Sequence, residues 1–422
     1  MNFKFFSICC VLASFGSLSS NAQEQKKFNY NLYGFVRAET FVDTYKGVDA
    51  GYELFYIAPL YVGKDANGKD INKQTSANLQ ALASRVGVNI NGPDVFGAKT
   101  SATIEVDFGG IVKTEPTLLR IRQAFVSFKW ENSSLLAGQT WHPFWGAGTA
   151  QVSGLNTGAP FQAFNRSPQL RYNHNVGDLT FSLSGVYESQ YTSKTFESSV
   201  YTSANQAQRN GVMPELVLSA AYNMEKLQVG IGGQVKRLKP RMTTKVNDNV
   251  YVSGEFITTY GAMAYLYYKG PKLTIVAKDY YGQNLSHLTL IGGYGVASRD
   301  DLTGAETYTP YVSNSCFLNA VYGTKWQGGL TLGYSRNFGT KDALYNGNFK
   351  DITGGLLPDV KDLCRLAPHL SLNISNLKFI FEYEVTSAKY GVGELDYSDG
   401  LFLDSHRATN NRLGLTMIYM FN

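Results

Sequence analysis

The chain has 422 residues, with 38 Lys and Arg against 33 Asp and Glu, and a formal net charge of +5 at pH 7. A balance this close to neutral argues against nucleic acid as a partner, because nucleic-acid-binding domains concentrate positive charge. The 28 Tyr, 25 Phe and 42 Gly against only 12 Pro are typical of strands and of the aromatic girdles of membrane barrels. No apolar run beyond the N-terminus is long enough for a membrane helix, which excludes a helical membrane protein.

The N-terminus has the pattern of an export signal. Lys4 precedes an apolar run over residues 5–18, and Ser20-Asn21-Ala22 offers a small-residue cleavage site. The run is shorter than the ~20 residues of a membrane-spanning helix. We therefore expect a cleaved signal peptide over residues 1–22 and a single β-barrel domain over residues 23–422.

The mature chain alternates between apolar and polar residues with a period of two. In residues 100–108, Ala102, Ile104, Val106 and Phe108 share one face, and Ser101, Thr103, Glu105 and Asp107 share the other. Residues 179–184, 227–234 and 370–374 repeat the pattern. A soluble sandwich produces the same alternation, so the lengths of the connections decide between the two folds.

Seven short, turn-rich connections alternate with eight long polar ones. The expected turns are 91–94, 131–133, 175–178, 223–226, 269–271, 325–328 and 375–376. The expected loops are 44–80, 110–117, 142–168, 191–213, 239–254, 285–314, 338–366 and 389–408. Fifteen connections predict an all-β transmembrane antiparallel barrel of about sixteen strands, with short periplasmic turns and long extracellular loops.

The last segment, residues 413–422, is amphipathic and places Phe421 next to the end. Such a strand is similar to the signal that barrel-assembly machinery reads in its clients. We therefore expect a protein of the outer membrane of a Gram-negative bacterium, in contact with outer-membrane lipid and assembled by that machinery.

The sequence offers no catalytic or metal-binding motif. The five His are scattered, no paired Cys motif occurs, and Gly-x-Ser-x-Gly is absent. We expect no enzyme activity, no metal and no cofactor. Cys316 and Cys364 remain in the mature chain, and the sequence leaves open whether they pair.

Charged residues within the strands are expected to face the lumen, because a charge on the lipid face costs about 2–4 kcal/mol at the bilayer midplane. Around Arg120 and Arg122 the alternation changes phase, which predicts a bulge near Gln123. Inward arginines in a narrow bore attract anions; alternatively, they only pair with inward carboxylates. The candidate pore-lining residues are Arg37, Arg85, Arg120, Arg122, Arg166, Arg171, Glu39, Glu105 and Asp107.

The loop 142–168 is rich in aromatic residues. Exposing them to water would be unfavourable, so we expect this loop to fold into the lumen as a constriction, with Arg166 as its charged tip. The alternative is an aromatic patch for subunit contact. The candidate constriction residues are Trp141, His142, Phe144 and Trp145.

Six short segments of the N-terminal part resemble the DcaP-like porins, a family of trimeric outer-membrane channels. They are Gly34-Phe-Val-Arg-Ala-Glu39, Ser84-Arg-Val-Gly87, Glu105-Val-Asp-Phe108, Arg122-Gln-Ala-Phe125, Gly138-Gln-Thr-Trp141 and Ser167-Pro-Gln-Leu-Arg-Tyr172. The resemblance implies sixteen strands, a homotrimer, inward basic residues at Arg37, Arg85, Arg120, Arg122 and Arg171, and uptake of small anionic solutes such as dicarboxylates. Members of the family carry an N-terminal helical extension, whereas here only residues 23–27 precede the first strand.

The sequence thus predicts a passive diffusion channel for small hydrophilic solutes that prefers anions such as small (di)carboxylates. One alternative is a substrate-specific channel with a saturable site. Another is a barrel that does not transport and only displays adhesive or structural loops.

Overall fold

The computed structural model describes residues 28–50, 53–109, 117–196 and 204–421. The expected signal peptide, residues 1–22, lies outside the described residues. In the part of the chain that is described, no helix is long and apolar enough to cross a membrane.

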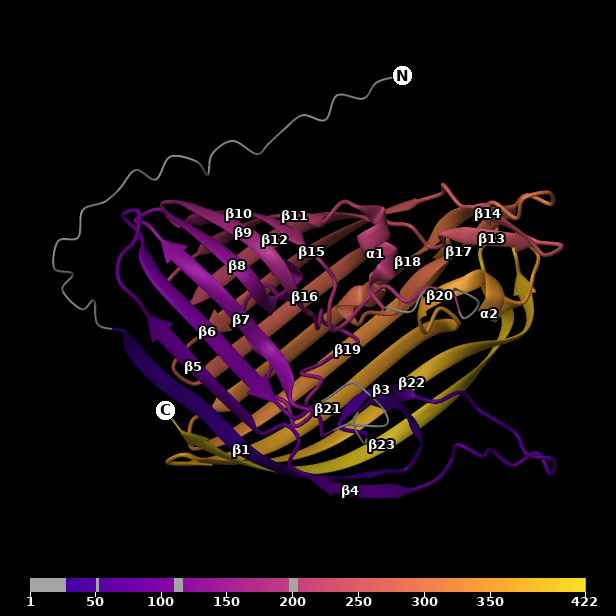
Figure 1. Cartoon of the computed structure of the whole chain (residues 1–422). Coiled ribbons are helices and arrows are strands. Elements are labelled where there is room, and N and C mark those ends of the chain that lie inside the picture. The colour runs from indigo at the N-terminus through magenta and orange to yellow at the C-terminus, as the bar shows by residue number, and fades with distance from the viewer. Residues whose placement is uncertain (1–27, 51–52, 110–116, 197–203, 422) are drawn as a thin grey trace, which may run out of the picture.

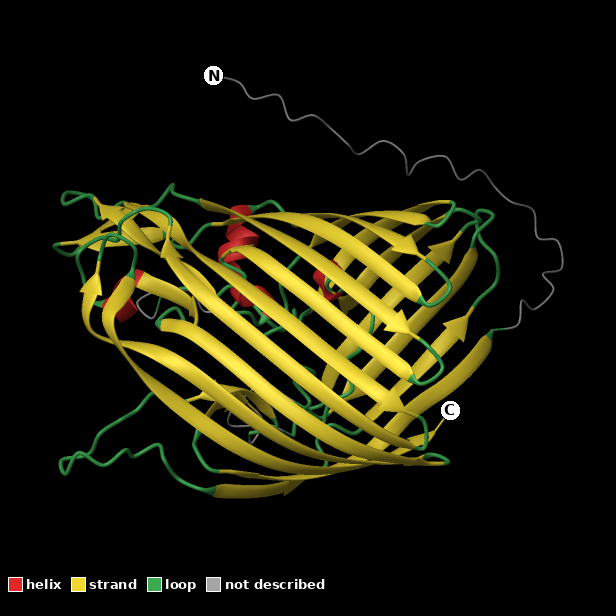
Figure 2. Cartoon of the chain, turned by 180° about the vertical axis from the view of Figure 1, so that it is seen from behind, coloured by secondary structure: helices red, strands yellow, loops and turns green. Residues whose placement is uncertain are grey.

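Sixteen antiparallel strands form a closed barrel, as the alternation predicted. The first strand pairs with the last, from Gly34 opposite Phe421 to Asp43 opposite Arg412, and this pairing closes the sheet. Figures 1 and 2 show the strands running obliquely around the barrel from both sides. The strands are β1 (Asn29–Asp43), β5 (Arg85–Asn91), β6 (Lys99–Asp107), β7 (Arg120–Lys129), β8 (Ser133–Trp141), β9 (Arg166–Val176), β10 (Leu179–Val186), β11 (Glu215–Asn223), β12 (Leu227–Leu238), β15 (Ile257–Lys269), β16 (Leu273–Gln283), β18 (Glu306–Gly323), β19 (Trp326–Thr340), β21 (Val360–Ile374), β22 (Leu377–Asp396) and β23 (Leu401–Phe421).

The connections carry smaller elements. Three short strands, β4, β17 and β20, join the barrel sheet beyond its sixteen members, whereas β2–β3 and β13–β14 form separate hairpins. In Figure 1 the tight turns gather at one end of the barrel, and α2, β13, β14, β17 and β20 gather at the other. The bounds are β2 (Gly47–Ala50), β3 (Phe55–Pro59), β4 (Ser76–Gln80), η1 (Pro143–Trp145), α1 (Gln206–Gly211), β13 (Thr243–Val246), β14 (Asn249–Val252), η2 (Ser286–Leu288), β17 (Gly292–Arg299), α2 (Phe349–Ile352) and β20 (Thr353–Leu356).

All seven expected turns connect successive strands, but three expected loops are too long. The loop predicted over 389–408 is almost entirely strand, because β22 and β23 stay paired until Asp396 meets Leu401. Likewise β18 begins at Glu306 and β21 at Val360, inside the expected loops 285–314 and 338–366. The polar composition of these strand ends suggested loops, yet cross-strand pairing continues there because backbone pairing does not need an apolar face.

The alternation places apolar residues outside and polar residues inside. In β23, Leu413, Leu415, Met417 and Tyr419 are exposed, while Arg412 and Thr416, which belong to the alternate positions, are buried. Because the outward side chains of a membrane barrel meet lipid, this face fits a bilayer. The C-terminal strand therefore has the amphipathic form expected from the sequence.

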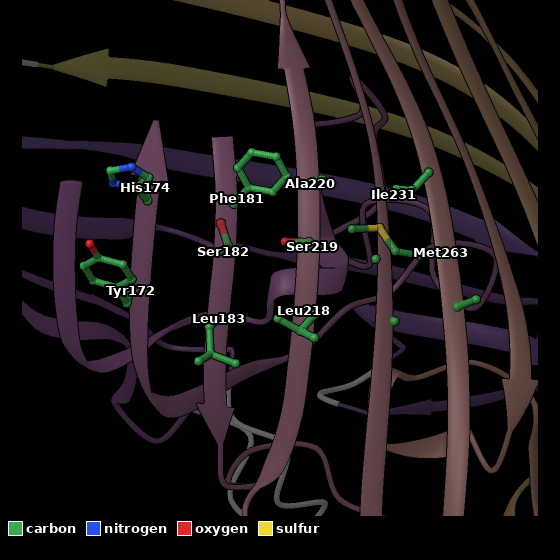
Figure 3. Close-up of a pocket in the computed structure, with 13 residues that line it drawn as sticks. Tyr172, His174, Phe181, Ser182, Leu183, Leu218, Ser219, Ala220, Ile231 and Met263 are labelled. Carbon is green, nitrogen blue, oxygen red and sulfur yellow. The ribbon is translucent and has the colours of Figure 1, made fainter. Parts of the chain in front are cut away.

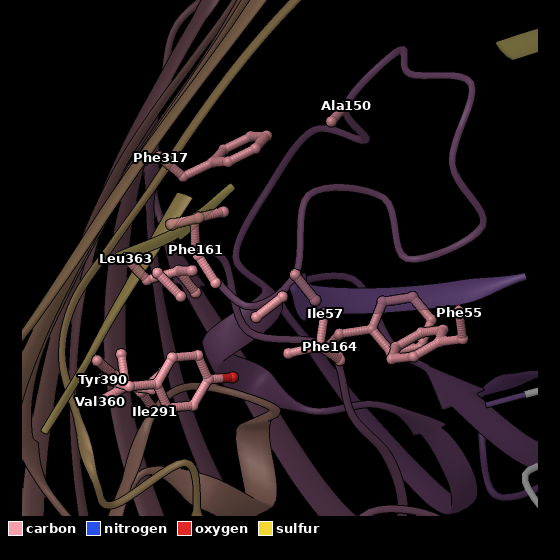
Figure 4. Close-up of a cluster of buried hydrophobic side chains, with 14 of the residues drawn as sticks. Phe55, Ile57, Ala150, Phe161, Phe164, Ile291, Phe317, Val360, Leu363 and Tyr390 are labelled. Carbon is pink, nitrogen blue, oxygen red and sulfur yellow. The ribbon is translucent and has the colours of Figure 1, made fainter. Parts of the chain in front are cut away.

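The largest buried apolar cluster lies inside the barrel, where loop residues pack against the inner wall. Figure 4 shows Phe161 beside Leu363 and Phe317, which belong to wall strands, and Phe55 beside Phe164. At Gly333 of β19, a Cβ atom would collide with the Phe161 ring. A glycine at this position is what lets the loop lie directly against the wall.

Cys316 and Cys364, the two cysteines of the described residues, are free. Cys316 and Cys364 both lie opposite Tyr334, on the two strands that flank β19. Two strand spacings amount to about 9–10 Å, which is too far for a disulfide.

Candidate functional site

The segment from His142 to Asn165 folds into the barrel, as predicted for a constriction. Phe144 and Phe161 are fully buried, and the wall strands hold the loop through its backbone. Lys278 Nζ donates to the carbonyl of Trp145 at 2.6 Å, and the Tyr280 hydroxyl donates to that of Phe144 at 3.1 Å. The loop therefore forms a fixed part of the lumen.

A group of arginines and carboxylates lines the inner wall formed by β5 to β9, here called the basic wall. Arg120 donates two hydrogen bonds of 2.9 Å to Asp107. Arg122 reaches both carboxylates, with 2.8 Å to Glu105 and 2.9 Å to Asp107. Arg85 lies 3.8 Å from Glu105. The predicted inward charges of this wall are thus brought into one network.

A bulge in β7 lets Arg120 and Arg122 both face the lumen without exposing Val126 to it. The ladder with β6 shifts register between Glu105, which faces Gln123, and Val106, which faces Ile121. Arg122 is therefore the extra residue. The bulge predicted near Gln123 is confirmed, one position earlier.

Arg166 and Arg171 belong to the same wall, and neither ion-pairs with a carboxylate among the described residues. Arg166 is fully buried, and its guanidinium carbon lies 4.7 Å from the centre of the Trp141 ring. Its Nε and Nη1 atoms have no hydrogen-bond partner in the described part of the chain. Arg171 donates to Gln169 and to the carbonyl of Trp141 at 2.7 Å. The sequence predicted Arg166 at the tip of the constriction loop. This is wrong, because Arg166 begins β9 and therefore lies at the base of the loop.

Counted together, the basic wall holds Arg85, Arg120, Arg122, Arg166 and Arg171 against Glu105 and Asp107. These are five guanidinium groups against two carboxylates. In a narrow bore with low-dielectric walls, such a surplus produces a positive potential.

The adjoining part of the inner wall, formed by β1 and β21–β23, is here called the paired wall. It is continuous with the basic wall, because β1 pairs with β5 along one edge and with β23 along the other. Arg37 lies 2.7 Å from Glu39, and Arg412 forms two hydrogen bonds of 2.7 and 2.8 Å to Asp43. A third pair joins Arg365 to Glu384 at 3.1 Å. Sequence reasoning did not select Arg365, because it lay within an expected loop. Each arginine of this wall has its own carboxylate.

The aromatic residues predicted for the constriction do lie together. Trp141 stacks on Trp145 with ring centres 4.0 Å apart, and Phe164 meets Trp141 edge-on at 5.3 Å. Trp141 ends β8, so it belongs to the wall and not to the loop. A cavity of about 140 Å³ adjoins the loop at Pro143 and is lined by Arg171 and polar residues of β10 to β12.

The fold also brings together two histidines that the sequence left apart. His142 and His287 both lie beside Glu215 in the interior. No sequence spacing could reveal this, because the three residues come from two loops and the start of β11.

A larger hollow of about 670 Å³ lies on the wall of β9 to β12 and β15 (Figure 3). Its rim includes Leu183, Leu218 and Ile231, which are outward-facing and more than half exposed. The hollow therefore faces the lipid side and is separate from the charged lumen.

A closed sheet of sixteen strands with an inward loop and a charged inner face defines the porin type of barrel. Among solved structures, the chain is similar to the outer-membrane channel DcaP of Acinetobacter baumannii, with a TM-score of 0.62 and 17% identity over 93% of this chain and 97% of that chain. The fold implied by the resemblance in the sequence is thus confirmed.

Two further structures share the fold. The outer membrane protein OmpT of Vibrio cholerae has a TM-score of 0.53 at 11% identity, over 96% of this chain and 99% of that one. An anion-selective porin from Comamonas acidovorans has a TM-score of 0.51 at 12% identity, over 94% of this chain and 100% of that one. No protein-family model matches the sequence, and no curated protein matches it.

Proposed function

We propose that the protein is an outer-membrane channel through which small hydrophilic solutes diffuse passively, with a preference for anions such as small (di)carboxylates. The observation that carries the proposal is the surplus of guanidinium groups on the basic wall, where Arg166 and Arg171 lack an ion-pair partner among the described residues. Guanidinium groups are suited to carboxylates because their paired donors match the two oxygens.

The cellular setting follows from the same proposal. Residues 1–22 act as the cleaved signal peptide, residues 23–422 form one barrel domain, and the long connections face the outside. DcaP of Acinetobacter baumannii, whose structure is similar, is described as an outer membrane channel, and one structure of Vibrio cholerae OmpT is described as a trimer form. We propose a homotrimer here as well.

A second candidate is a substrate-specific channel with a saturable site. The cavity of about 140 Å³ beside the constriction loop, lined by Arg171 together with Thr180 and Gln228, offers a cationic and polar surface to a small anion. Saturation of flux at rising solute concentration would distinguish this function from free diffusion.

Single-channel conductance of the folded, purified protein in a planar bilayer tests the proposal. We expect stable current steps in KCl, in groups of three for a trimer, and flux of succinate into liposomes. Folded protein that passes neither ions nor succinate would contradict channel function and favour a barrel that displays its loops.

A further inference from the structure

The buried cluster around Glu215 has the composition of a metal site. His142 follows β8, Glu215 opens β11 and His287 lies in η2, and each side chain is at most 1% exposed. The Nε2 atom of His142 lies 3.3 Å from Oε1 of Glu215, and that of His287 lies 3.1 Å from Oε2. The three ligand atoms lie within 4.8 Å of one another.

We propose that His142, Glu215 and His287 bind a divalent transition-metal ion of the Zn²⁺ class. Zinc accepts two imidazole nitrogens and a carboxylate at about 2.0–2.2 Å, with a further position open to water. Ligand atoms at such distances around one ion lie about 3–3.5 Å apart. The two nitrogen–oxygen separations of the cluster, 3.3 and 3.1 Å, fall in this range.

The hydrogen bonding of the cluster is incomplete, which gives an independent reason for an ion. His287 Nε2 and Glu215 Oε1 form one hydrogen bond of 3.3 Å. His142 Nε2 and Glu215 Oε2 are buried and make close contacts only within the cluster, and neither has a hydrogen bond of good geometry among the described residues. Buried polar atoms without a partner are unfavourable and uncommon. One ion between the imidazoles and the carboxylate would satisfy both atoms.

The charges around the cluster permit a divalent cation. Lys236 Nζ lies 2.7 Å from Nδ1 of His287, on the side of the ring away from Glu215, and 3.5 Å from Glu188. Lys236 also donates to Ser193 Oγ and to the carbonyl of Asn284, so it keeps oxygen partners if the imidazole nitrogen takes up a proton.

An ion at this position would join the constriction loop to the barrel wall. His142 is the first residue of that loop, and its Nδ1 accepts a hydrogen bond from the backbone N–H of Phe144 at 3.1 Å. A metal on Nε2 places the remaining proton on Nδ1, so this bond must give way when the ion binds. We therefore expect zinc to change the position of the loop as well as to bind.

Zinc titration of the full-length, folded protein tests the proposal, with a chelator used first to remove metal. We expect one Zn²⁺ per chain, and binding weaker by about a hundredfold or more in Glu215→Gln and His287→Gln, because losing a ligand should cost at least as much as losing a residue that supports one. The control is His174→Gln, which changes an exposed histidine of β9 that is not part of the cluster. Wild-type protein that binds no zinc, or variants that bind it as tightly as the wild type, would overturn the proposal.

Co²⁺ absorption provides a measurement on the wild type alone, in case a variant does not fold. We expect visible bands typical of low-coordinate nitrogen and oxygen ligation, removed by added zinc. A spectrum identical to that of Co²⁺ in buffer would overturn the site without reference to any variant. Because both readouts report binding, failure here leaves channel function untouched.

Discussion

Two neighbouring parts of the inner wall, the basic wall and the paired wall, use the same residue types and differ in how these residues are paired. On the paired wall, Arg37, Arg365 and Arg412 each have a carboxylate within 3.1 Å. On the basic wall, two carboxylates serve five arginines, and Arg166 and Arg171 ion-pair with no carboxylate among the described residues. The number of inward arginines therefore says little about selectivity. What matters is how many of them lack a carboxylate.

The largest effect is expected from Asp107→Asn on the basic wall. Asp107 is fully buried and accepts hydrogen bonds from both Arg120 and Arg122. Removing its charge leaves two buried guanidinium groups facing a neutral amide, which should cost about 3–5 kcal/mol of folding free energy. Urea unfolding of the barrel measures this.

The control for Asp107 is Asp362→Asn. Asp362 pairs with Arg407 at 2.6 Å, but the Arg407 side chain is 45% exposed. An exposed pair contributes only about 0–1 kcal/mol. Equal losses in both variants would contradict the claim that the basic wall is a buried network.

A second effect concerns selectivity. Arg171→Gln on the basic wall should lower the ratio of anion to cation permeability roughly threefold or more, because it removes a cation that no described carboxylate neutralises. Arg37→Gln on the paired wall leaves Glu39 behind and should lower the ratio through the added negative charge, with an additional loss of stability. The double variant Arg37→Gln/Glu39→Gln should restore the wild-type ratio. An anion-to-cation permeability ratio that stays low in Arg37→Gln/Glu39→Gln would contradict the proposed difference between the basic wall and the paired wall.

A smaller effect is expected at the loop anchor. Lys278→Met removes the donor to the Trp145 carbonyl and the cation that lies 4.2 Å from the Trp145 ring centre. The loop should become mobile, at a cost of roughly 1–3 kcal/mol, and open-channel current noise should rise. Lys226→Met, in an exposed turn, is the control, and noise that rises equally there would argue against an anchoring role.

The smallest effect is expected on the lipid side. Ile231→Ala in the outer hollow should leave ion selectivity unchanged and stability nearly so, because Ile231 is 65% exposed on the outward face. A measurable change of reversal potential in this variant would show that the assignment of faces by alternation is wrong.

Much of the fold was readable in the sequence. The period-two pattern and the turns gave sixteen strands, and the change of phase around Arg122 gave the bulge. Alternation also placed Arg85 and Glu105 on one face. Failures arose where polar residues continue a paired strand, as at Arg365, and where the fold joins distant loops, as at His142 and His287. Alternation says which face a residue occupies, but not which residue faces it across the lumen.

The most direct test of the central claim is the reversal potential of the wild type and of Arg166→Gln/Arg171→Gln under a KCl gradient at about 0.1 M. Charge-based selectivity is strongest there, because the Debye length is about 10 Å at 0.1 M and about 3 Å at 1 M. We predict an anion-selective potential for the wild type that moves toward zero in the double variant and at 1 M salt. A wild-type potential at zero, or one unchanged by the two substitutions, would contradict the account.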